Sequence, residues 1–197
     1  MARGTRLQWT VLAVLLICAP ADMFANGVWP TQINFQVPGG TAEGNARIAV
    51  SVPGQDVATG NMQVVSSGPG IFLADFLSID RPGAGLTERN QLVGPTVLAR
   101  RNEVIQIYAT GAGPLTPSVA DGAAAPASPL AQTISPPRVF IGSEEAAIEF
   151  SGLTAGYAGL WQINARVPDV ASIIGQAPVE IVAPGGYASN AVTIWVE

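Results

Sequence analysis

The chain has 197 residues and a formal net charge of −5, and only 12% of its residues are charged. All nine basic residues are arginine, because the sequence contains neither lysine nor histidine. Nucleic-acid binding needs several phosphate contacts from a basic face. The largest basic cluster is the pair Arg100–Arg101, so we expect no nucleic-acid partner.

Residues 1–25 have the pattern of an export signal. Arg3 and Arg6 precede an apolar run over residues 7–19, and Ala19-Pro20-Ala21 is a small-x-small cleavage pattern, with cleavage after Ala25 as the competing choice. The run is shorter than the ~20 residues of a membrane span. We therefore expect a secreted or cell-surface protein, which contacts a membrane only if the signal stays uncleaved.

The single cysteine, Cys18, lies inside this segment. Cleavage would leave a mature protein without a thiol, which excludes disulfides, thiolate metal sites and cysteine nucleophiles. Since histidine is also absent, we expect no zinc site and no Ser-His-Asp catalysis. The sequence therefore predicts no cofactor, no metal site and no catalytic residue.

After residue 26, short β-branched or alternating runs are separated by Gly, Pro, Asn and Asp, a pattern typical of an all-β fold. The predicted strands are Gln32–Val37, Arg47–Val52, Met62–Ser66, Val104–Thr110, Arg138–Ile141, Ala146–Ser151, Trp161–Val167, Val179–Ala183 and Ala191–Val196.

Two segments between these runs have no clear period. Pro114–Pro137 is rich in Ala, Pro and Ser; a linker is one interpretation, and an extended loop inside a domain is the favoured one because strands flank it closely. Residues 68–98 are expected to connect two modules. The apolar run Ile71–Leu73, with Phe76 and Leu77, would then pack at the joint.

An internal repeat is the most informative feature. Gln32-Ile-Asn-Phe-Gln-Val-Pro38 matches Gln162-Ile-Asn-Ala-Arg-Val-Pro168 at an offset of 130 residues. The segment Ile48–Gly54 matches Val179–Gly185 at an offset of 131, and Met62-x-Val matches Val192-x-Ile. A fixed offset indicates a duplicated structural unit.

Five motifs together resemble a known family. They are Q-I-N-x-x-V-P, I-Y-A-T-G-x-G-P (Ile107–Pro114), V-F-I-G (Val139–Gly142), S-G-L-x-x-G-x-x-G-L-W-Q-I-N (Ser151–Asn164) and S-N-x-V-x-I (Ser189–Ile194). The chain from about Trp29 to Glu197 resembles the uncharacterised C-terminal domain first noted in Solibacter and abundant in secreted Acidobacteria proteins. The resemblance implies exported, tandem immunoglobulin-like modules similar to those of plexins and transcription factors. It implies no activity and no site residue.

The predicted fold is an immunoglobulin-like β-sandwich, with one complete module preceded by a partial one. The predicted organisation is a signal peptide over 1–25, a partial module over 26–75, a connector over 76–98 and a complete module over 99–197. The first module has only residues 26–31 ahead of its Gln-Ile-Asn strand. Either the gene model is truncated or a sheet edge stays unpaired and offers a template for another strand.

Carboxylates are the remaining candidates for chemistry. Asp75 and Asp80 fall in the connector, and Glu144, Glu145 and Glu149 cluster around one turn. A calcium site or a glycosidase pair would use such groups. A solvated strand face explains them more simply, because Glu149 alternates with apolar neighbours.

Tyr157 and Tyr187, in Gly-rich turns, are the candidate ligand contacts, whereas Trp161 and Trp195 lie in strands and are expected in the core. The repeated Asn34 and Asn164 are expected to tie loop backbones by their amides. The predicted function is a non-enzymatic surface module for adhesion, spacing or protein interaction. A module that binds polysaccharide is the alternative, and a carboxylate-dependent hydrolase is the weaker one.

Overall fold

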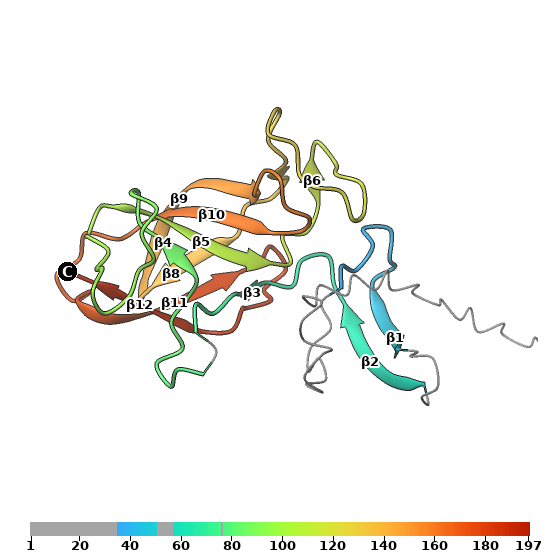
Figure 1. The fold of residues 1–197 in the computed structure, drawn as a ribbon, viewed down its shortest axis with the longest axis horizontal. Helices are drawn as coiled ribbons and strands as arrows, with labels where there is room; N and C mark the ends of the chain where they lie inside the picture. The colour runs from blue at the N-terminus through green and yellow to red at the C-terminus, as the bar shows by residue number, and fades with distance from the viewer. Residues whose placement is uncertain (1–34, 51–56, 76) are drawn as a thin grey trace, which may run out of the picture. The chain divides into compact units, whose positions relative to one another are not determined.

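The computed structural model describes residues 35–50, 57–75 and 77–197. By its internal contacts the chain divides into two compact units, Met1–Val65 and Ser66–Glu197. Every regular element within the described ranges is a β-strand (Figure 1), so the predicted all-β class is confirmed. In the same ranges, no helix is long and apolar enough to cross a membrane.

The second unit holds one antiparallel sheet system. Its strands are β3 (Gly70–Ile71), β4 (Gly85–Leu86), β5 (Val104–Thr110), β6 (Leu115–Thr116), β7 (Gln132–Thr133), β8 (Arg138–Ile141), β9 (Glu144–Leu153), β10 (Trp161–Arg166), β11 (Gly175–Val182) and β12 (Val192–Val196). The main path of pairing runs β12-β11-β8-β9-β10-β5-β3, with β4 on β5 and the β6–β7 pair on β9.

The two ends of this path approach each other. Pro82 forms a parallel bridge with Thr193, and Ala99 forms another with Val196. Backbone hydrogen bonds support both, including Gly83 N–H to the Thr193 oxygen at 2.9 Å. The sheet therefore curls into a nearly closed barrel (Figure 1). Closure protects strand edges that would otherwise pair with other chains.

The long strand β9 joins the two halves of the sheet. Its first residues pair with β8, and from Ala147 onward it pairs with β10. Between them the register shifts, with Phe150 opposite Asn164 and Ile148 opposite Ala165, so that Glu149 is the extra residue of a β-bulge. A bulge bends its strand and increases the local twist, which lets one strand serve both halves.

The core is built from alternate residues of the main strands, because successive side chains of a strand point to opposite faces. Its fully buried members include Ile105, Ile107, Ala109, Val139, Ile141, Trp161, Ile163, Ala165, Val167, Val179, Ile181, Ile194 and Val196. A smaller cluster of Ala125, Ala131 and Leu153 packs beside β7 and β9. The segment 114–137 is thus a loop built into the second unit, as the favoured interpretation predicted.

The first unit contains a β-hairpin, β1 (Gly44–Val50) paired with β2 (Ala58–Val64). Ala46, Ile48 and Met62 are half-buried, while their strand neighbours are exposed. Within this unit, Ile48 lies opposite Gly60, whereas Val179 of the second unit lies opposite Val192. The repeat matches Ile48 with Val179 and Met62 with Val192, so the register of the first hairpin is shifted by two residues relative to that of the second. Because side chains alternate between faces with a period of two, this shift keeps every side chain on the same face.

Most predicted strands are confirmed, with shifts of a few residues at their ends. Val104–Thr110 and Arg138–Ile141 have the predicted bounds. The predicted strand Gln32–Val37 lies mainly outside the described residues, as do the predicted signal over 1–25 and Phe76. The described part of that strand, residues 35–37, is not extended into a sheet pairing.

The segment predicted as a connector has a different place in the structure. The division between the units falls after Val65. Residues 76–98 contain β4, and Ile71 is buried in the core of the second unit. The expectation that Leu77 packs at a joint is wrong, because its side chain is 82% exposed. This segment, which has no periodic pattern in the sequence, thus forms an edge of the sheet through a two-residue strand and isolated backbone hydrogen bonds.

Candidate functional site

The outer edge of β1 is the candidate interaction site. β1 and β2 form a two-stranded sheet, and no described residue pairs with β1 on the side away from β2. An unpaired edge carries a row of free backbone donors and acceptors. A two-stranded hairpin is also only marginally stable in water, so a third strand on this edge would stabilise the hairpin.

The corresponding edge in the second unit is covered. There β8 lies along β11, with Phe140 opposite Glu180 and Val139 opposite Ile181. The Gly142 N–H donates to the Pro178 carbonyl oxygen at 2.7 Å. Since alternate residues of a strand face each neighbour, Pro178 and Glu180 turn their backbone groups to β8. Ile181, an odd-numbered residue of the same strand, instead turns its backbone groups to the β12 side, where they bond with Ser189.

The repeat places this geometry on β1. At the offset of 131 residues, Arg47 corresponds to Pro178 and Ala49 to Glu180. Both Arg47 and Ala49 are exposed. By this correspondence their backbone groups face away from β2. On the same correspondence, the outer edge of β1 has the backbone pattern that pairs with β8 on the edge of β11.

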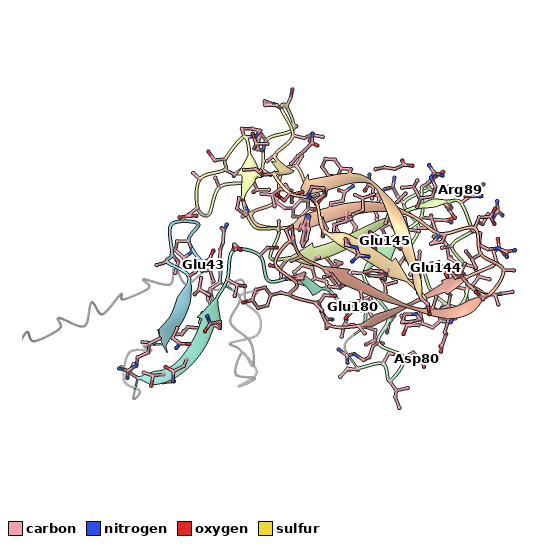
Figure 2. All side chains as sticks on the ribbon, turned by 180° about the vertical axis from the view of Figure 1, so that it is seen from behind. Glu43, Asp80, Arg89, Glu144, Glu145 and Glu180 are labelled. Atoms are coloured by element: carbon pink, nitrogen blue, oxygen red, sulfur yellow. The ribbon has the colours of Figure 1, made fainter. Side chains whose placement is uncertain are left out.

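The glutamates of β9 lie on an exposed, paired face. Arg138 donates two bonds to Glu145, from Nε at 2.9 Å and Nη2 at 2.7 Å, and its guanidinium lies 4.8 Å from the centre of the Phe140 ring. The hydrogen bond from Arg138 lowers the pKa of the Glu145 carboxyl below its usual value. Figure 2 labels Glu144 and Glu145 on this strand and Glu180 on β11. This is the solvated strand face that the alternation predicted.

Two shallow hollows lie along β9. One, of about 410 Å³, is lined by Pro136, Pro137, Glu145 and Ile148 among others. The other, of about 260 Å³, shares Pro136 and Ile148 and contains Glu149. Each hollow thus holds one carboxylate, and both carboxylates are bonded to arginine, Glu149 to Arg166. A glycosidase needs two carboxylates across one bond, so neither hollow favours that chemistry.

The two aspartates lie in an exposed loop. Asp75 Oδ1 accepts a hydrogen bond from the Leu77 N–H at 2.9 Å. This is an Asx-turn, in which the carboxylate binds the backbone two residues further along. Asp80 is labelled on the same loop in Figure 2. Among the described residues, no three acidic, histidine or cysteine side chains gather as metal ligands.

The two candidate tyrosines are both accessible. Tyr157 is 59% exposed and Tyr187 is 49% exposed. Tyr157 lies in the turn between β9 and β10, where its carbonyl accepts the Ala125 N–H at 3.0 Å. Tyr187 lies after Gly185 and Gly186 in the turn between β11 and β12. The structure assigns them to different turns, and nothing in it joins them into one surface.

The predicted role of Asn164 is wrong. Its Oδ1 accepts a bond from Gln162 on the same strand at 2.9 Å rather than tying a loop, and its counterpart Asn34 lies outside the described residues. Asn190 has the expected role instead: its amide accepts from the Ile71 N–H at 2.8 Å and donates to the Ile71 oxygen at 3.0 Å. This bond pair fixes β3 on the barrel and gives the S-N-x-V-x-I motif a structural reason.

No family model, no curated protein and no solved structure matches the chain.

Proposed function

We propose that the chain is an exported, non-enzymatic immunoglobulin-like module whose first unit binds a strand from another protein along the edge of β1. The observation that carries this proposal is the contrast between two edges. β11 is covered by β8 along residues 179–182, whereas the matching edge of β1 has no partner among the described residues. Strand addition to such an edge gives affinity through backbone bonds and specificity through alternate side chains.

The immunoglobulin-like assignment rests on several features. The sheet is antiparallel, its two halves enclose the main core, and β9 passes from one half to the other. The resemblance to exported Acidobacteria modules implies the same fold, and the signal pattern over residues 1–25 supports export.

The side-chain chemistry supports a binding role. The chain has no lysine and no histidine, and Cys18 lies in the signal pattern, so the usual general bases and activated nucleophiles are missing. Glu145 and Glu149, the carboxylates of the hollows, are bonded to Arg138 and Arg166.

The test uses a synthetic peptide with the β8 sequence, residues 137–143, labelled with a fluorophore and titrated with the full chain. We expect saturable binding. Ala49→Pro should weaken it about tenfold, because proline removes one outward N–H and a lost bond is worth about 1 kcal/mol. Proline is tolerated on edge strands when its nitrogen faces away from the partner, so the β1–β2 pairing should persist.

The matched control is Ala49→Thr, which keeps the N–H and should bind as the wild type does. A peptide with Phe140→Pro, which cannot complete the ladder, should bind poorly. Equal binding of the peptide by the wild type and by Ala49→Pro, or no binding to either, would contradict the proposal.

A further inference from the structure

A row of uncharged polar side chains lies on the outward face of β5 and β10. The register pairs Gln162 with Tyr108 and Asn164 with Gln106. Behind them, Ile107 and Ile163 are fully buried. The rigid core therefore fixes the backbone that presents these four side chains, and all four are half-buried.

The side chains form one hydrogen-bonded network. Gln106 Oε1 accepts from the Tyr108 hydroxyl at 3.1 Å and from Gln162 Nε2 at 3.5 Å. Gln162 Nε2 also donates to Asn164 Oδ1 at 2.9 Å, and Gln106 Nε2 donates to Asn90 Oδ1 at 3.2 Å. We call these five residues, Asn90, Gln106, Tyr108, Gln162 and Asn164, the amide strip.

The loop that supplies Asn90 is held in place. Asn90 adopts φ 57°, in the left-handed region that asparagine tolerates best after glycine. Its N–H donates to the Thr87 carbonyl at 2.9 Å, and the buried Thr87 hydroxyl accepts from Arg89 and Gln91. The amide of Asn90 is therefore positioned before any ligand arrives.

Aromatic rings, including the strip's own Tyr108, border its amide groups on two sides. Phe150 lies opposite Asn164 on β9, and its ring lies so close to Gly152 that a Cβ there would be 2.8 Å from the Phe150 Cζ. On the other side, burial raises the pKa of the Tyr108 phenol, and the nearby Tyr157 raises it further. Tyr108 therefore stays a neutral donor at physiological pH. The exposed Tyr157 extends this border.

The strip differs from the neighbouring outward face of the same sheet. On β8, β9 and β11 the outward residues include Arg138, Glu145 and Glu180, which is the ordinary composition of a solvated strand face. Beyond Asn164 on β10, the outward Arg166 is paired with Glu149 of β9. The strip itself carries no formal charge. Three of its polar groups, Gln162 Oε1, Asn164 Nδ2 and Asn90 Nδ2, have no bond within the network.

The geometry points to a binding site for neutral polysaccharide on the amide strip. Carboxamides offer donors and acceptors side by side, which suits sugar hydroxyls that both donate and accept. Phe150 and Tyr157 offer ring faces and edges for the apolar faces of sugar rings. Across β9, β10 and β5 the platform is about 10 Å wide, and its open shape suits a chain rather than an enclosed small molecule. The absence of charge favours neutral over acidic polymers.

The test is electrophoresis of the full chain in gels that contain a soluble β-glucan, xylan or mannan, or acidic polygalacturonate. We expect at least one neutral polymer to retard the wild type. Gln106→Ala should raise the dissociation constant about tenfold, because Gln106 bonds to three strip residues and its loss releases all of them. Gln162→Ala should act in the same direction.

Gln176→Ala is the matched control, since Gln176 is an exposed glutamine on the outward face of β11; it should bind as the wild type does. Retardation by polygalacturonate alone, equal retardation of Gln106→Ala and wild type, or no retardation by any neutral polymer would overturn the assignment. Ala49→Pro should leave retardation unchanged, because this site is independent of the β1 edge. The two proposals can therefore fail separately.

Discussion

Replacing Trp161 by alanine is expected to lower the free energy of unfolding of the second unit by about 3–5 kcal/mol. The side chain is 1% exposed, the largest of the fully buried side chains. Its indole N–H donates to Ser151 Oγ at 3.0 Å, and the same oxygen bonds to Thr133 Oγ1 at 2.8 Å. The substitution leaves a cavity and also removes a bond that ties β10 to β9 and β7.

Trp195→Ala is the control for this prediction. Trp195 is half-buried on the outward face of β12, in alternation with buried Ile194 and Val196, so the expectation that it lies in the core is only partly met. Its loss should cost roughly half as much. The measurement is urea unfolding followed by circular dichroism, and equal losses for the two variants would contradict the assigned core.

Gly111→Ala is expected to destabilise the second unit by about 3–5 kcal/mol, for two separate reasons. Gly111 has φ +82°, where a side chain is strained, and a Cβ there would lie 1.9 Å from the Gly68 carbonyl oxygen. The backbone at Gly68 has little room to move, because the adjacent Ser67 hydroxyl donates to the Gly111 oxygen at 2.8 Å.

Gly156→Ala separates the effect of the backbone strain from that of the steric clash. Gly156 has nearly the same φ, +83°, but a Cβ there would meet nothing within 4 Å. Its substitution should therefore cost only the backbone strain, about 1–2 kcal/mol. Unfolding curves measured side by side give the difference in free energy of unfolding. Similar losses at the two positions would show that Gly111, just after β5, does not lie against Gly68 as described.

The main strands were predictable because apolar residues alternate with polar ones along most of their length. Val104–Thr110 and Trp161–Arg166 show this pattern plainly. The edges were not predictable, since two-residue strands such as Gly70–Ile71 and Gly85–Leu86 have no period. Their place depends on distant partners, as when Asn190 binds the backbone of Ile71.

The candidate site residues were predictable to a smaller extent. Tyr157 and Tyr187 are accessible, as Gly-rich turns indicated. The amide strip was missed because Gln106 and Gln162 are 56 residues apart and meet only through the register of β5 and β10. The alternation of Gln and Asn with apolar residues in Trp161–Arg166 indicated that one face of this strand is polar. The sequence did not show that β5 is its neighbour, so Gln106 and Tyr108 could not be placed beside Gln162 and Asn164.

The central claim is that the outer edge of β1, which no described strand pairs, is open, whereas the matching edge of β11 is covered by β8. Hydrogen exchange of the full chain, followed by mass spectrometry, tests this claim most directly. We predict that amides of residues 44–50 exchange roughly a hundredfold or more faster than those of residues 175–182, and that the β8 peptide slows exchange on β1. Equal protection of the two strands without the peptide would contradict the account, because it would mean that the edge of β1 is already covered.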